Sequence, residues 1–140
     1  MTYTLNKNDI YALVDAEVSL VADEAYADGG TSLYDAVVLT SKDRATVDRY
    51  IDDGVASLMH ALPDMATLSG TTLTITAPDI VSDNATQATN RISRYLALYA
   101  ITEILQSRRA ALVPRYAERV AAALDDVIAL VRTRTAPTRS

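Results

Sequence analysis

The sequence of 140 residues contains no cysteine, tryptophan or phenylalanine, and it has a single histidine, His60. Without cysteine the chain forms no disulfide, which fits a reducing compartment or a particle assembled in one. Zinc sites are built from cysteines or several histidines, so the composition predicts none. A nucleophilic triad needs a general base, and a single histidine off the apolar face of an expected helix is typical of a surface residue.

Signals for membranes, secretion and phosphate binding are also missing. No run approaches the roughly 18 apolar residues of a membrane-spanning helix, and MTYTLNKND lacks the basic and apolar parts of a signal peptide. Gly29-Gly30 is not followed by the GK[ST] of a phosphate loop. Asp52-Asp53 and Asp125-Asp126 fall on expected helices, where neighbouring residues point about 100° apart, so they predict solvated surface. We therefore expect no enzyme, cofactor, metal site or membrane contact.

The composition that is present predicts one globular domain. Hydrophobic residues make up 49% and charged residues 22% of the chain, and this length suits a single core. We expect residues 1–131 to form the domain. Residues 132–140, RTRTAPTRS, are polar and contain proline, so we expect a flexible tail.

Apolar residues recur at spacings of three and four in four stretches, which predicts four helices. Asn6 is the expected cap of the first helix, and Asp28-Gly29-Gly30 is its expected end. Residues 31–39 remain open between a short helical turn and an extended link. The third stretch is apolar around most of its circumference, which is typical of a central helix. Gly54 lies inside the second stretch, where glycine is unfavourable, and predicts a close helix crossing. The expected helices cover about 7–27, 41–62, 84–109 and 114–131.

A short threonine-rich stretch, LSGTTLTITAPD at 68–79, alternates with a period of two and predicts a strand. Ser69-Gly70 is typical of a tight turn, so residues 65–68 are the expected partner strand of a short β hairpin. A lone hairpin is marginal in water, so we expect one backbone edge to lack partners and to contact another subunit. The expected fold class is mainly α, a bundle of about four helices with one short β hairpin.

Charge is divided unevenly along the chain. Residues 1–90 carry four basic and fourteen acidic groups, whereas residues 91–140 carry nine arginines and four acids, giving net charges of −10 and +5. Such halves can neutralise each other within the fold, attract a second copy head-to-tail, or bind nucleic acid. The acidic pI of about 4.7 favours protein carboxylates over DNA as partners of the arginines. The candidate subunit or partner interface comprises Ser69, Gly70, Thr72, Thr74, Thr76, Arg108, Arg109, Arg115 and Arg119.

Three segments together carry a family resemblance. They are SKDRATVDRYIDDGVASLMHAL, TLTITAPD and RISRYLALYAITEILQSRRAALVPRYAERVAAALDDVIALVR. In order and character, these elements resemble the small head-to-tail connector (adaptor) proteins of tailed bacteriophages. The likeness covers roughly residues 41–131 and lies in the succession of helix, short β element and two helices.

The resemblance implies a non-enzymatic virion protein that is made in the host cytoplasm and placed in the phage neck. Such proteins form a ring, commonly of twelve copies, between the portal protein and a tail or second neck protein. DNA passes through the channel of the ring without sequence-specific binding. Two alternatives stay open: a small helical partner-binding or regulatory module, and a nucleic-acid binder that uses the C-terminal arginines.

Overall fold

The computed structural model of the chain describes residues 2–37, 39, 41–61, 66–69, 72–76 and 85–131. These residues form a mainly α fold of four helices with short antiparallel strands, so the expected fold class is confirmed. The expected flexible tail, 132–140, lies outside the described residues. In chain order the elements are β1 (Thr2–Asn6), α1 (Lys7–Val37), α2 (Arg44–Ala61), β2 (Ala66–Ser69), β3 (Thr72–Thr76), α3 (Ala85–Arg108) and α4 (Val113–Val131).

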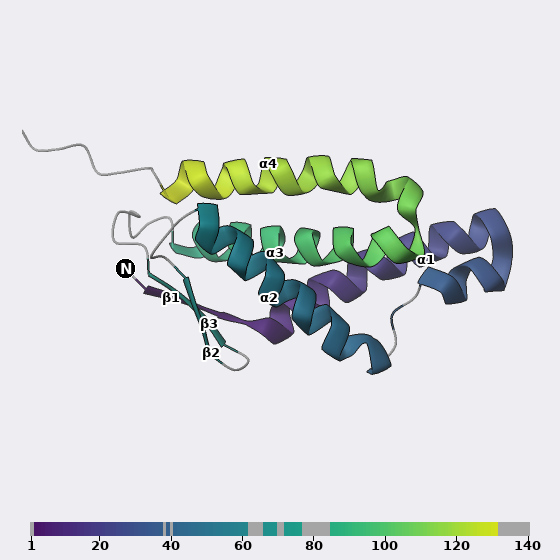
Figure 1. The fold of residues 1–140 in the computed structure, drawn as a ribbon, viewed down its shortest axis with the longest axis horizontal. Coiled ribbons are helices and arrows are strands. Elements are labelled where there is room, and N and C mark those ends of the chain that lie inside the picture. Colours follow the sequence, from purple (N-terminus) through teal and green to yellow (C-terminus); the bar gives the residue numbers. More distant parts are fainter. Residues whose placement is uncertain are drawn as a thin grey trace, which may run out of the picture.

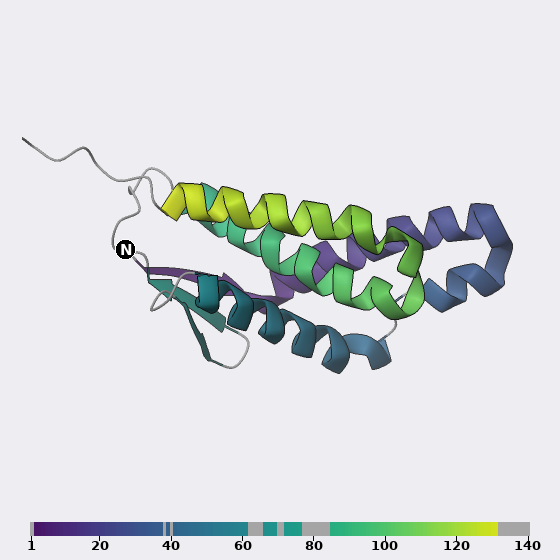
Figure 2. The same ribbon diagram turned by 45° about the horizontal axis from the view of Figure 1, so that its top comes forward.

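Helix α3 occupies the middle of the bundle, as its girth of apolar residues predicts. It contacts α1, α2 and α4, which surround it in both ribbon views (Figures 1 and 2). Between residues 95 and 105 only Tyr99 and Glu103 are half-buried and the others are buried, which explains why this part of α3 has no exposed polar face. Its buried apolar side chains are Ile92, Tyr95, Leu96, Ala97, Leu98, Ala100, Ile101, Ile104 and Leu105.

Helix α1 begins at the predicted cap. The side-chain oxygen of Asn6 accepts a hydrogen bond of 2.9 Å from the backbone N–H of Asn8, one of the donors left free in a first helical turn. Most of the predicted apolar stripe is buried against the bundle, but Leu13 is 46% exposed. The buried members of the stripe are Ile10, Val14, Val18, Val21 and Ala25.

The expected helix end at Asp28-Gly29-Gly30 is a kink instead. Gly30 has φ 75° and ψ −159°, a conformation that side-chain-bearing residues rarely adopt, and the chain then resumes its helical path to Val37. Residues 31–37 are therefore helical rather than an extended link. Helix α1 runs past the end of α3 and folds back at the kink (Figure 1). We call residues 18–37 the arm.

The strands form a three-stranded sheet in the order β1-β3-β2, with both neighbouring pairs antiparallel. The hairpin of β2 and β3 is as predicted, although Ser69 belongs to β2 and pairs with Thr72 instead of lying in the turn. Strand β1 was not expected. It pairs along the other edge of β3, from Thr2 opposite Thr76 to Asn6 opposite Thr72.

The expectation that β3 has a free edge is therefore wrong. The first residues of the chain supply the missing partner, and three strands leaning on helices are more stable than an isolated hairpin. The sheet contacts α2, α3 and the start of α1. Leu5 of β1 is buried in the common core, which anchors the sheet to the helices.

Helix α2 follows a 3₁₀ turn at Ser41–Asp43 and packs across α3. Its predicted apolar face is buried at Val47, Ile51, Val55 and Leu58, whereas Met59 is 39% exposed. Gly54 lies at the crossing, where a Cβ atom would stand 3.2 Å from Cδ1 of Tyr99. The close crossing predicted from Gly54 is thus confirmed.

Candidate functional site

Two arginines at the C-terminal end of α3 hold the base of the arm. Arg108 donates to Oδ1 of Asp43 at 2.8 Å and to the carbonyl oxygen of Val37 at 3.3 Å. Arg109 donates to Oδ2 of Asp28 at 3.0 Å. The arm is therefore tied to α3 both before and after its kink. Both arginines were expected at a subunit interface, but their guanidinium groups bind partners within the same chain.

A second contact joins α1 to α4. The hydroxyl of Tyr116 donates to Oε1 of Glu17 at 2.6 Å, and Nη1 of Arg119 lies 3.4 Å from the same oxygen. The guanidinium of Arg119 also lies 4.9 Å from the centre of the Tyr116 ring. Arg119, another expected interface residue, is thus engaged within the chain, whereas Arg115 is exposed. These pairs favour internal neutralisation of the two oppositely charged halves.

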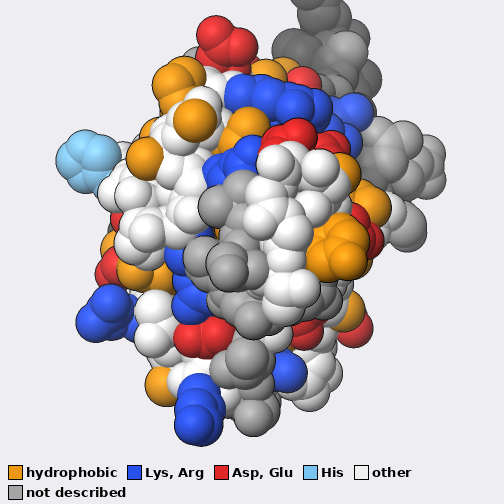
Figure 3. Space-filling view, turned by 90° about the vertical axis from the view of Figure 1, so that its right-hand side faces the viewer, with side chains coloured by type: hydrophobic (Ala, Val, Ile, Leu, Met, Phe, Trp, Pro, Cys, Tyr) orange, Lys and Arg blue, Asp and Glu red, His pale blue; other side chains and the backbone are white. Residues whose placement is uncertain are grey.

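Basic and acidic side chains are also mixed on the surface of the protein, as internal neutralisation of the two halves predicts. On the side that carries the arm, Lys and Arg side chains lie beside Asp and Glu side chains instead of gathering into a face of one sign (Figure 3). Nucleic acid is bound through extended basic faces, so this side does not offer the footprint of a DNA-binding protein.

Replacing Tyr116 with phenylalanine should lower the free energy of unfolding by about 2 kcal/mol at pH 7, because the hydrogen bond to the Glu17 carboxylate is lost. Burial and the Glu17 carboxylate raise the pKa of Tyr116 to about 12. The unfolded chain releases this proton near pH 10, so the stability contributed by Tyr116 is complete below pH 10 and is lost as pH rises towards 12.

Urea unfolding at pH 7, 10 and 11.5 measures both effects. The curves of stability against pH for the native protein and Tyr116→Phe should converge above pH 10, because the variant has no phenol to titrate at this position. Parallel curves over this range would contradict the assigned coupling between Tyr116 and Glu17.

A buried lysine connects the start of α1 to α2. Nζ of Lys7 lies 2.7 Å from Oδ1 of Asp48 and 2.7 Å from Oδ1 of Asp52, and its side chain is 4% exposed. The hydroxyl of Tyr11 also donates to Asp48, and the guanidinium of Arg44 lies 4.0 Å from the centre of the Tyr11 ring. Asp52, which the sequence predicted as solvated surface, therefore has a structural role, whereas Asp53 is exposed.

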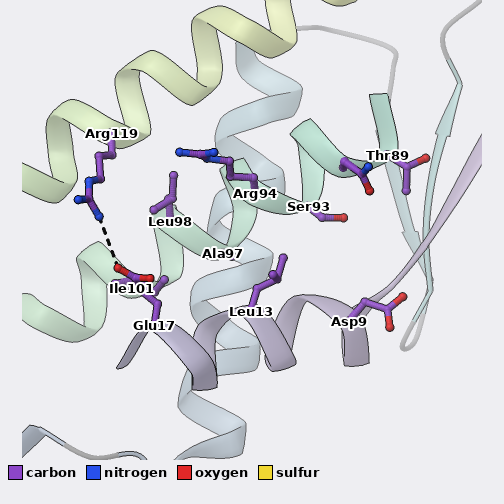
Figure 4. Close-up of a pocket in the computed structure, with 11 residues that line it drawn as sticks. Asp9, Leu13, Glu17, Thr89, Ser93, Arg94, Ala97, Leu98, Ile101 and Arg119 are labelled. Carbon is purple, nitrogen blue, oxygen red and sulfur yellow. Dashed lines mark hydrogen bonds and ion pairs between the residues drawn. The ribbon is translucent and has the colours of Figure 1, made fainter. Parts of the chain in front are cut away.

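A groove of about 670 Å³ lies between α1 and α4, with α3 as its floor. Ala97, Leu98 and Ile101 line the floor and Leu13 lines one wall. The close-up in Figure 4 shows Arg94 and Arg119 extending over this apolar floor, with Asp9 at the far end. Leu13, Asp9 and Arg94 are exposed, so the groove presents an apolar side chain and one charge of each sign to solvent.

The outward face of the arm is the second surface with an unusual character. Leu20 is 59% exposed and Tyr26 is 57% exposed, the two highest values among the exposed large hydrophobic side chains of the described residues. Asp23 and Glu24 lie between them in the sequence and are also exposed. The opposite face of this segment is buried at Val21, Ala22 and Ala25, so the arm is ordered helix with an apolar and acidic outer side.

The strand residues of the expected interface are placed by their backbone. Ser69 lies in β2, and Thr72, Thr74 and Thr76 lie in the central strand β3. Their side chains, and Gly70 as a whole, lie outside the described residues. The structure brings none of these strand positions into the arm or the groove.

The described residues contain no recognisable catalytic or metal-binding cluster. His60 is exposed, and no group of three or more His, Asp or Glu residues in the described part of the chain could hold a metal ion. None of the described helices is both long enough and apolar enough to cross a membrane. No family model, no curated protein and no solved structure matches the chain.

Several residues of the ion pairs, the arm and the groove were not predicted from the sequence. Lys7, Glu17 and Asp48 look like ordinary surface charges of amphipathic helices, and their pairing depends on which helices meet. Leu20 and Tyr26 carry a usable signal, because they are large apolar residues placed off the buried stripe of their own helix. Arg94 carries no comparable signal in the sequence.

Proposed function

We propose that the chain is a structural, non-enzymatic component of the neck of a tailed bacteriophage, where copies form a ring between the portal and the tail. The observation that carries the proposal is the arm. This helical projection extends beyond the bundle (Figure 2) and exposes Leu20 and Tyr26 to solvent. Contiguous exposed apolar surface marks interaction sites, and Leu20 and Tyr26 lie on one face of the same projecting helix.

Ring formation needs two different surfaces that fit each other, because each copy contacts the next head-to-tail. The outward face of the arm and the groove under Arg94 are two such surfaces on separate parts of the molecule. The succession of helices and β element over residues 41–131 resembles phage connector proteins, and this resemblance supports the location in a neck.

The sequence predicted two other grounds for assembly, a free strand edge and an unbalanced charge, and neither supports the proposal. Both edges of β3 are paired within the chain, so this strand offers no edge to a neighbour. Arg108, Arg109 and Arg119 bind acidic groups of their own chain, so three of the nine arginines of residues 91–140 are paired with acids of the other part of the chain. The proposal therefore rests on the arm, the groove and the resemblance.

Immunogold labelling of purified tailed particles whose genome encodes this chain should place the label at the junction of head and tail. Quantitative mass spectrometry of the same particles should give several copies for each portal ring, with twelve as the number implied by the resemblance. Absence of the chain from purified particles would overturn the proposal. A monomer in solution would not, because assembly on the portal is part of what is proposed.

The groove also favours a second candidate, a helical module that binds a soluble partner. An apolar floor with one exposed arginine is a reasonable receptor for an amphipathic helix that carries an acid. Discrete dimers bound to a soluble host protein, together with absence from particles, would favour this candidate over the neck protein.

A further inference from the structure

The arm presents one continuous helical face to solvent. Ser19, Leu20, Asp23 and Tyr26 are exposed, and at about 100° per residue they span roughly 120° of the helix circumference. The other side of the same segment is buried. This arrangement is that of an amphipathic helix whose outward face carries two apolar anchors and Asp23, with Glu24 exposed at its edge.

The groove offers the complementary set. Leu98 and Ile101 form the floor but are only 7% and 1% exposed, so Leu13, 46% exposed at the wall, is the main accessible apolar side chain. Arg94 projects above Leu98 from one turn earlier on α3 (Figure 4). A volume of about 670 Å³ is enough for a few side chains from one face of a helix.

We infer that the arm of one copy docks in the groove of the next copy, with Leu20 against Leu13 and Leu98 and with Asp23 facing Arg94. This inference rests on the proposed ring and names the contact that would build it. Charge complementarity favours the arm as the occupant, because residues 18–31 contain three acids and no base. In the groove Arg119 is paired with Glu17, so Arg94 is the exposed cation beside the floor, and the acid Asp9 lies at the far end.

Ion pairs within the chain limit which acids of the arm can contact the next copy. Asp28 is held by Arg109 within its own chain, so it is committed to fixing the base of the arm. Of the two other acids, Asp23 lies between Leu20 and Tyr26 around the helix, whereas Glu24 lies beyond Leu20, at the edge of the outward face. The contact is heterologous, because the arm and the groove are different surfaces, and it can therefore be repeated around a ring.

Disulfide trapping tests the contact directly, because the native chain has no cysteine. Ser19→Cys places a thiol on the outward face of the arm, and Ser93→Cys places one in the lining of the groove. Both changes are nearly isosteric and leave Leu20, Asp23 and Arg94 intact. The two single-cysteine variants are tagged differently, mixed in equal amounts and assembled with the portal protein of the same genome under mild oxidation.

A disulfide between the two differently tagged chains is expected, since such bonds form only when Cα atoms approach within about 7 Å. Met59→Cys, an exposed position on α2, replaces Ser93→Cys in the control mixture and should give no mixed disulfide. A chain that carries both Ser19→Cys and Ser93→Cys should give a ladder of linked copies. A ladder that stops at the dimer would show that two arms exchange symmetrically, and it would overturn the head-to-tail contact.

The outcomes separate the two proposals. Rings on the portal without a mixed disulfide would overturn the arm contact and leave the neck function standing. A mixed disulfide between free copies of a chain that is absent from particles would overturn the neck function and support the contact. If the chain is absent from particles and no mixed disulfide forms, both the neck function and the arm contact are overturned.

A charge exchange provides an independent measurement of the same contact. Asp23→Arg should weaken assembly roughly fivefold, which is typical of one exposed ion pair turned into a repulsive one. Mixing this variant with copies that carry Arg94→Asp should restore assembly at those contacts where the two variants meet. Equal loss in the mixture would overturn the assigned pairing of Asp23 with Arg94.

Discussion

Replacing both Asp48 and Asp52 with asparagine should lower the free energy of unfolding at pH 7 by about 3 kcal/mol. The loss comes from Lys7, whose ammonium group lies 2.7 Å from each carboxylate and is almost entirely buried. Removing the acids leaves a buried charge without a counter-ion, and such changes cost about 3–5 kcal/mol. We take the lower end because both aspartates are partly exposed and water can approach the site.

The two sides of this ion cluster are not equivalent. Lys7→Met removes the buried charge and keeps a side chain of similar length, while the carboxylates it leaves behind can be hydrated. We therefore expect Lys7→Met to cost less than the double aspartate variant. This order of stabilities tests whether the carboxylates serve mainly to compensate the buried lysine.

The pH dependence gives the cluster a distinct signature. Burial by itself lowers the pKa of Lys7, but hydrogen bonds to Asp48 and Asp52 and their negative charges outweigh it and raise the pKa. Burial likewise raises the pKa of Asp48, and the hydrogen bonds from Lys7 and Tyr11 outweigh it and lower the pKa. The cluster therefore stabilises the native fold at pH values between the folded pKa of Asp48 and the folded pKa of Lys7. This stabilisation is lost as pH falls through the folded pKa of Asp48 or rises through that of Lys7.

In the double asparagine variant only burial acts on Lys7, so its pKa should fall below that of the unfolded chain. The unfolded state then binds more protons at mildly alkaline pH, and the stability of the variant should rise between about pH 8 and 10. Urea unfolding across this range measures the slope. Asp53→Asn on the exposed neighbouring position is the matched control and should lose less than about 0.5 kcal/mol. A double variant as stable as this control would contradict the assigned role.

Replacing Gly54 with valine should cost about 2–3 kcal/mol, because the added atoms enter the crossing of α2 and α3. A Cβ atom there stands 3.2 Å from Cδ1 of Tyr99 and 3.3 Å from Cδ2 of Leu96, closer than ordinary contacts between carbon atoms. Overpacking of this kind costs about 1–3 kcal/mol. Gly54→Ala should be nearly neutral, because its gain in helix propensity of about 1 kcal/mol offsets a mild clash.

Thermal and urea unfolding of three further variants separate packing from propensity. Ala56→Val lies on the exposed side of α2 and should change stability by less than about 1 kcal/mol. Tyr99→Ala opens space at the crossing, so adding Gly54→Val to it should cost less than adding Gly54→Val to the native chain. Equal costs in the two backgrounds would contradict the close approach of Gly54 and Tyr99.

The local features of the fold were predictable from the sequence. Helix caps and apolar periodicity depend only on residues that are close together in the sequence. They therefore predicted where α1, α3 and α4 begin and that α3 is central. Gly54 was predictable for the same reason, since a glycine inside an apolar helix face usually has a packing cause.

Features that depend on distant partners could not be predicted. Strand β1 is only five residues long, and nothing near it in the sequence shows that it pairs with Thr72–Thr76. The glycine pair at 29–30 is typical of a helix end, whereas the ties from Arg108 to Val37 and from Arg109 to Asp28, which hold the folded-back arm, join residues far apart in the sequence. The groove between α1 and α4 exists because both helices pack on α3, which is a property of the assembled bundle.

The pairing of β1 with β3 also has a consequence for how the protein is made. Thr2 is opposite Thr76, so β1 is synthesised before β3 and Thr2 has no partner until more than 70 further residues have been translated. At about 5–20 residues per second, this delay lasts roughly 4 to 15 seconds. During that time the nascent chain carries an unpaired strand ahead of a helix. The strand TYTLN contains one aliphatic residue among polar and tyrosine side chains, a composition that limits aggregation while translation continues.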